Sequence, residues 1–238
     1  MWLTACVLVA EVTFLSVISD SLTKRIATIL YALSRSKTVS ISALTLILFP
    51  GTVIHELSHL FVAEILGVRT GKLTLAPEHI SDEELQAGSV SIGHTDPFRR
   101  TLIGIAPFFI GLGVLSTLAY FFGQQFQPIF DAGRWPDLLN WKSIVTLGLY
   151  YYAIGTMSTS MFSSPEDLKG TLPVFLTLGL VIGGLWMAGI RLPVDRSVSD
   201  ALSSILTSLS ITLGVVLGIN ILTFIILTRL ISILRRHR

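Results

Sequence analysis

The sequence predicts an all-α polytopic membrane protein with about six transmembrane helices and a small strand-like or re-entrant segment after the second. Of its 238 residues, 51% are apolar and only 13% are charged, whereas soluble domains carry about 25% charged residues. The mean hydropathy is +0.73 over the whole chain. The apolar residues gather in long runs, which is the pattern of membrane-spanning segments.

A transmembrane helix needs about 20 mostly apolar residues. The candidate segments are 2–18, which contains Glu11, and then 40–67, 101–122, 144–162, 172–190 and 205–227. The connections between them are short and leave no room for a sizeable soluble domain. We therefore divide the chain into an N-terminal span with an amphipathic segment (1–38), a membrane core (39–170) and two C-terminal spans (171–238).

Two connections have a pattern of their own. Apolar residues recur at helical spacing over 22–35 among three basic ones, which predicts an interfacial amphipathic helix, a continuation of the first span or a solvated helix end. The segment 68–100 alternates instead: Leu73, Leu75, Val90 and Ile92 are separated by small or polar residues. This is strand-like periodicity, and it predicts either a hairpin with its tip at 77–87 or an ordinary polar loop.

The second span contains the chemically informative motif, His55-Glu56-Leu57-Ser58-His59. On a helix, positions i and i+4 share a face, so both imidazoles can bind one zinc ion. Glu56 lies about 100° around the helix from His55 and can act as a general base without binding the metal. Ionisable side chains buried in a membrane cost free energy, so they usually have a functional role. The alternative is a pair of histidines hydrogen-bonded inside the bundle.

The surrounding residues suggest access to this site. Gly51 and Thr52 precede His55 by about one turn and Ala63 follows His59, so we expect room there for water and a substrate backbone. Pro50 removes one helical hydrogen bond and predicts a kink.

Catalytic zinc usually has three protein ligands. The metzincin pattern is excluded because Val62 and Ile65 replace its Gly and His. Glu78, Glu83 and Glu84 are far enough downstream for a gluzincin-type ligand but lie in the strand-like connection. We prefer Asp167, which follows the fourth span between Pro165 and Gly170. Glu166, His94 and Asp96 remain alternatives, and Asp167 could instead cap the next helix.

An HExxH motif inside a span, followed by an aspartate after a later span, resembles the site-2 protease family of intramembrane zinc metalloproteases. The similarity covers roughly 55–170. It includes Gly67-Val68 after the motif helix and the small residues of Gly104-Ile105-Ala106-Pro107. The family's second motif has Asn, then Pro, then Leu-Asp-Gly. Here Asp167 is followed by Leu168 and Lys169, and Ser158, Thr159 or Ser160 stands near the Asn position.

The resemblance implies one catalytic zinc ion held by His55, His59 and Asp167, with Glu56 as the base. The implied substrate is a transmembrane helix of another membrane protein, which must unwind before cleavage and could then pair with the strand-like segment. The implied location is a lipid bilayer, and we expect it to be a prokaryotic cytoplasmic membrane. Nothing in the charge balance suggests nucleic acid, and the sequence leaves the oligomeric state open.

Other functions remain possible from the sequence. They are a membrane zinc transporter, an inactive family member with an interaction role, and another membrane metallopeptidase such as a prenyl-protein protease. A transporter needs further acidic or histidine residues on other spans, and the first span has only Glu11. With six alternating spans, the Lys and Arg residues divide nine against eight between the two faces, so the positive-inside rule gives no orientation.

Overall fold

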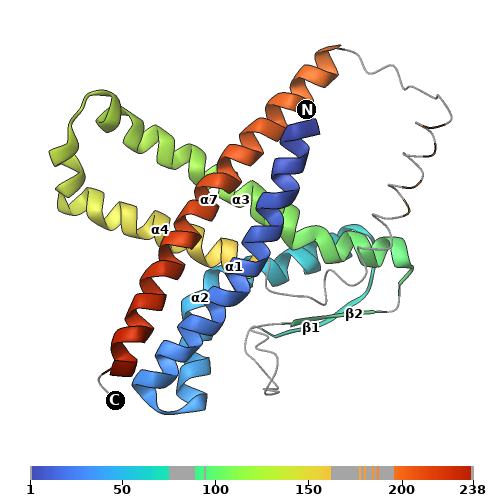
Figure 1. Ribbon diagram of the computed structural model, residues 1–238. Coiled ribbons are helices and arrows are strands. Elements are labelled where there is room, and N and C mark those ends of the chain that lie inside the picture. Colours follow the sequence, from blue (N-terminus) through green and yellow to red (C-terminus); the bar gives the residue numbers. More distant parts are fainter. Residues whose placement is uncertain are drawn as a thin grey trace.

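The computed structural model describes residues 2–74, 89–93, 95–161 and 196–236, and helical residues at 177, 180, 184 and 187. The described part contains the long helices α1 (Trp2–Ser34), α2 (Lys37–Ile65), α3 (Pro97–Asp131), α4 (Trp141–Met161) and α7 (Arg196–Arg236). A short 3-10 helix, η1 (Trp135–Leu139), joins α3 to α4. Figure 1 shows α1 and α7 side by side, crossing the hairpin that α3 and α4 form.

Four of the described helices are long and apolar enough to cross a membrane: α1, α2, α3 and α7. The expectation of a polytopic helical membrane protein is therefore confirmed, but these four do not make up the six spans expected. The expected span 144–162 forms α4, which is too rich in Ser, Thr and Tyr to meet the same criterion. The expected span 172–190 lies mostly outside the described residues.

The centre of the bundle explains how α4 tolerates polar residues. Every residue of α4 from Thr156 to Met161 is buried, so neighbouring helices cover its hydroxyl groups. Apolar side chains of α1, α3, α4 and α7 form the main core around them: Leu15, Leu112, Leu115, Ile154, Met157, Met161, Leu213 and Val216. Polar side chains that neighbouring helices cover in this way are not exposed to lipid, whereas residues earlier in α4, such as Ile144 and Leu149, are exposed.

The segment 22–35 continues the first span as one helix, because α1 runs unbroken to Ser34. Arg35 then adopts a positive φ of 52° in the turn to α2, and Ser36 caps α2 by accepting a hydrogen bond from the Val39 amide. Of the three alternatives from the sequence, continuation is therefore the one observed. At 1.5 Å per residue, α1 is longer than the roughly 30 Å hydrocarbon layer.

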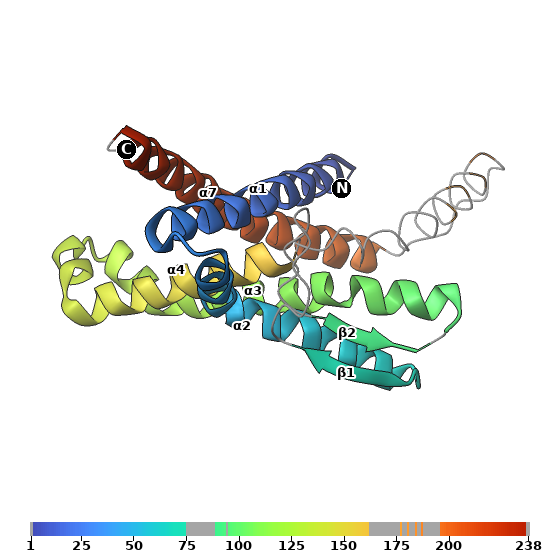
Figure 2. The ribbon, with the colours of Figure 1, turned by 90° about the horizontal axis from the view of Figure 1, so that it is seen from below.

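The strand-like expectation after the motif helix is confirmed by an antiparallel hairpin. Strand β1 (Thr70–Thr74) pairs with β2 (Ser89–Ile92), with Leu73 opposite Val90 and an irregularity in the pairing between Thr70 and Leu73. The expected tip, 77–87, lies outside the described residues. Figure 2 shows the hairpin beside the C-terminal end of α2, so the strands lie near the end of the helix that bears the motif.

Candidate metal centre

Helix α2 brings the two histidines of the motif together. The Nε2 atoms of His55 and His59 lie 3.3 Å apart, and the rings meet edge to face with their centroids 4.9 Å apart. Two nitrogens bound to one tetrahedral zinc at about 2.0–2.1 Å lie about 3.3–3.4 Å from each other. The spacing in the protein matches one edge of a zinc coordination tetrahedron, and it also lies within hydrogen-bonding distance, as in the alternative of two hydrogen-bonded histidines.

A backbone carbonyl on α3 orients His59. The Nδ1 atom of His59 lies 2.8 Å from the carbonyl oxygen of Ile103, in a buried contact. Because a carbonyl only accepts hydrogen bonds, Nδ1 must carry the proton and donate it. Nε2 of the neutral ring then presents its lone pair on the side of His55, which is the tautomer that a metal ligand requires.

The end of α2 supports this contact between helices. Gly67 has a φ of +67°, and the Val68 amide donates to the carbonyl of Ala63 at 2.9 Å. This is the geometry of a Schellman helix end, in which glycine takes the left-handed conformation. Ala63, Val68 and Ile103 then pack together in a small core, which holds the Ile103 carbonyl beside His59.

Glu56 is buried, with only 6% of its surface exposed, and His59 is similarly covered at 5%. Ser58 is also buried and donates to the carbonyl of Ile54 on the same helix. The motif thus sits in a largely water-excluded environment, where a carboxyl group on the same helix as two imidazoles is a candidate for proton transfer.

One expectation about access is wrong. The space beside Gly51 is not open to water or substrate, because α4 fills it. A Cβ atom on Gly51 would lie 2.5 Å from Ser160 Oγ and 2.7 Å from the carbonyl carbon of Thr156. The glycine instead permits close contact between α2 and α4, a known role of small residues between membrane helices. Tyr152 adds to this contact by donating to the Ile47 carbonyl at 3.0 Å.

The described residues around the histidines include no third group that would complete a metal site. No group of three or more His, Cys, Asp or Glu side chains suited to a metal occurs in the part of the chain that the structure describes. The preferred ligand Asp167 and the alternatives Glu166 and His94 lie outside the described residues, as do Glu78, Glu83 and Glu84. Asp96 caps α3, where its carboxylate accepts from the Arg99 amide and pairs with the Arg99 side chain.

Two features of the site were not expected from the sequence. The Ile103 carbonyl has no signature in the residue pattern, because any residue type supplies a backbone oxygen. The contact of Gly51 with α4 also depends on tertiary packing, although a glycine one turn before a motif histidine was a visible signal of it. The chain gives no significant match to protein-family models, to curated proteins or to solved structures.

Proposed function

We propose that this protein is a zinc-dependent intramembrane endopeptidase, similar to the site-2 proteases, which cleaves a transmembrane segment of a membrane-protein substrate. The observation that supports this most strongly is the 3.3 Å approach of the two Nε2 atoms on a helix apolar enough to span a membrane. The proposed catalytic core is 39–170, and the proposed setting is the cytoplasmic membrane of a prokaryote.

The residues present fit a zinc ion. His55 and His59 offer two imidazole nitrogens at the right separation, and the Ile103 carbonyl acts as the outer hydrogen-bond partner that zinc-bound histidines usually have. We assign the third position to Asp167. A zinc ion held by these residues would supply Lewis acidity at the scissile carbonyl and would lower the pKa of the attacking water.

The rest of the reaction falls to this chain's own residues. Glu56 accepts a proton from the attacking water while the oxygen of that water bonds to the scissile carbon. It then donates that proton to the leaving nitrogen as the carbon–nitrogen bond breaks, so no proton is gained or lost in the cycle. The burial of Glu56 limits competition from bulk water.

The β1–β2 hairpin is the proposed docking element for an unwound substrate, because an extended peptide can add to the edge of a sheet. Proline at Ser89 and at Ser91 removes two backbone N–H donors of β2 and disturbs its pairing with β1, so we expect both substitutions to slow cleavage. Proline at Thr38, in the first turn of α2, is the control, since the first amides of a helix are not needed within it. Cleavage that is unchanged by both β2 prolines would refute this docking role.

The decisive test of the function measures both the zinc content and the peptide cleavage of the same proteins. Reconstituted wild type and a Glu56→Gln variant are compared against a panel of labelled single-span peptides in vesicles. We expect Glu56→Gln to keep its zinc and lose cleavage, because the amide cannot accept the proton. Wild type that binds zinc but transports it across the vesicle membrane, with no peptide cleaved, would favour the transporter alternative.

A further inference from the structure

Side-chain contacts establish that α1 and α7 run in the same direction. Near the start of both helices, Ser210 donates to Glu11 at 3.0 Å. Further along both, the Arg25 guanidinium lies 4.0 Å from the centre of the Phe224 ring. Figure 1 shows the same arrangement, with the N-terminus beside the beginning of α7 and the C-terminus beside the turn from α1 to α2.

Helix α4 runs in the opposite direction to α7. Asn220 donates to the Ser158 hydroxyl at 3.0 Å, and Tyr151, earlier in α4, meets Thr223, later in α7, at 2.6 Å. These contacts place the end of α4 and the beginning of α7 at the same end of the bundle.

The neighbouring helices alternate in direction up to α4. His59 near the end of α2 meets Ile103 near the start of α3, and Phe122 in α3 packs on Tyr150 in α4. If α1 to α4 and α7 each cross the bilayer once, α7 crosses it in the same direction as α1. Six alternating spans would make the first and last antiparallel, which the contacts between α1 and α7 contradict. The common direction of α1 and α7 puts Trp2 and Arg236 toward opposite faces.

The directions of the helices determine which end of the bundle each described Lys, Arg, Asp and Glu residue occupies. Among the described residues, the end with the C-terminus (19–48, 122–150 and 221–236) contains nine of the 14 Lys and Arg residues and three of the eight Asp and Glu residues. The other described residues include five basic and five acidic ones. Among the described residues, the basic excess therefore lies at the end with the C-terminus.

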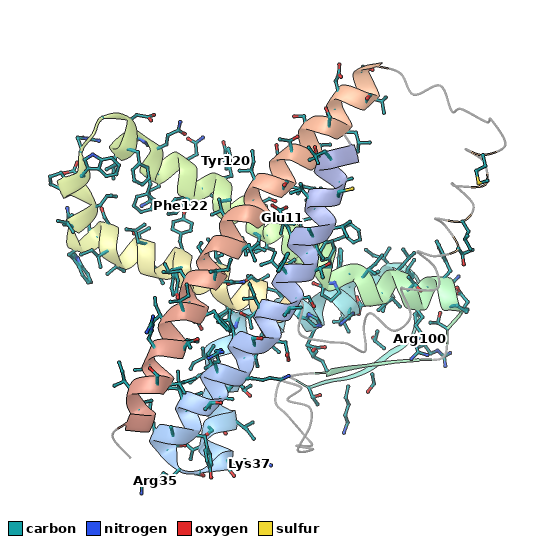
Figure 3. The ribbon with its side chains drawn as sticks, in the orientation of Figure 1. Glu11, Arg35, Lys37, Arg100, Tyr120 and Phe122 are labelled. Atoms are coloured by element: carbon teal, nitrogen blue, oxygen red, sulfur yellow. The ribbon has the colours of Figure 1, made fainter. Side chains whose placement is uncertain are left out.

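The basic residues form a cluster where α1 ends, α2 begins and α7 finishes. We call Lys24, Arg25, Arg35, Lys37 and Arg229 the basic end. Arg35, Lys37 and Arg229 are exposed, and Lys24 pairs with the nearby Asp20 at 2.8 Å. Figure 3 shows Arg35 and Lys37 at this end, far from Arg100, which lies beside the hairpin.

We propose that the basic end binds anionic phospholipid headgroups at one membrane face. The N-terminus and the β1–β2 hairpin then lie toward the other face. Clusters of four to eight Lys and Arg next to a membrane helix attract anionic lipids, each charge contributing up to about fivefold in affinity. Charge complementarity argues for a phospholipid surface, since these residues flank helices that already stand in the bilayer.

Topology is tested with single cysteines in a Cys6→Ser background, which removes the chain's one native thiol. A membrane-impermeant maleimide is applied to sealed vesicles of each orientation. We expect Thr38→Cys and a cysteine appended at the C-terminus to react from one side, and Ser197→Cys from the other. Asp137→Cys is the control, because it shares the face of Thr38 with either five or six spans. Opposite labelling of Thr38→Cys and the C-terminus would overturn the proposal.

Lipid binding is tested with spin-labelled phosphatidylglycerol in phosphatidylcholine vesicles. We expect wild type to prefer phosphatidylglycerol, and the triple variant Arg35→Gln, Lys37→Gln and Arg229→Gln to lose that preference by up to about fivefold per charge. The matched control, glutamine at Arg69, Arg99 and Arg100, keeps it.

A second lipid measurement does not depend on the folding of the variants. High salt should weaken the wild-type preference for phosphatidylglycerol, because salt screens exposed charges. Equal preference in both triple variants, or none in wild type, would refute a lipid-binding role for the basic end.

Discussion

Replacing Gly51 with alanine tests whether close contact between α2 and α4 sets the position of the motif. The new Cβ would meet Ser160 Oγ at 2.5 Å and the Thr156 carbonyl carbon at 2.7 Å, and backbone atoms cannot swing aside as a long side chain can. Overpacking of this kind costs about 1–3 kcal/mol of folding free energy. We use the upper value of about 3 kcal/mol because the Cβ atom would meet backbone atoms. Alanine regains about 1 kcal/mol of helix propensity.

The net expectation is a loss of about 2 kcal/mol, or about thirtyfold in the ratio of folded to unfolded protein. Reversible unfolding in mixed detergent micelles measures it. The control is Gly155→Ala on α4, whose Cβ meets nothing within 4 Å. Because His55 follows Gly51 by one turn, zinc affinity should fall in Gly51→Ala alone. If the two alanine variants have the same stability and zinc affinity, the contact between α2 and α4 does not support the site.

Three further predictions concern the metal and the bundle core. Removing zinc with a chelator should lower the unfolding midpoint and leave the helix content unchanged, since a ligand stabilises only the state that binds it; added zinc should restore the midpoint. Asp167→Ala should lose zinc in metal analysis while Glu166→Ala retains it, and the reverse result would assign Glu166 as the ligand. Asn220→Leu should destabilise the protein by about 1–2 kcal/mol, because Asn220 bonds the buried Ser158. Thr207→Val, which removes a hydroxyl bonded only within its own exposed helix turn, should change stability by less than about 0.5 kcal/mol.

The residue pattern predicted local structure well where one interaction dominates. Apolar runs predicted the helices, because the backbone must satisfy its own hydrogen bonds in a bilayer. Alternation of Leu73 with polar neighbours, and of Val90 with serines, predicted a hairpin that the structure contains. The spacing of His55 and His59 predicted that their side chains meet, since it follows from helix geometry alone.

Prediction from sequence failed where the answer depends on how helices pack. Segment 144–162 was predicted as one of six spans, yet the last residues of α4, from Thr156 to Met161, are buried against other helices of the bundle. Gly51 was expected to leave open space beside the helix, but it packs directly against α4. The common direction of α1 and α7 depends on pairs such as Glu11 with Ser210, which lie far apart in the sequence and have no local pattern.

X-ray absorption at the zinc edge of the purified wild-type protein tests the central claim most directly. We predict one zinc per chain, bound by two imidazole nitrogens at about 2.0–2.1 Å and otherwise by oxygen. His59→Ala should reduce both the zinc content and the imidazole contribution to the spectrum. Full-length protein without zinc after purification in zinc-containing buffer, or a zinc spectrum with no imidazole contribution, would contradict a metal centre at His55 and His59.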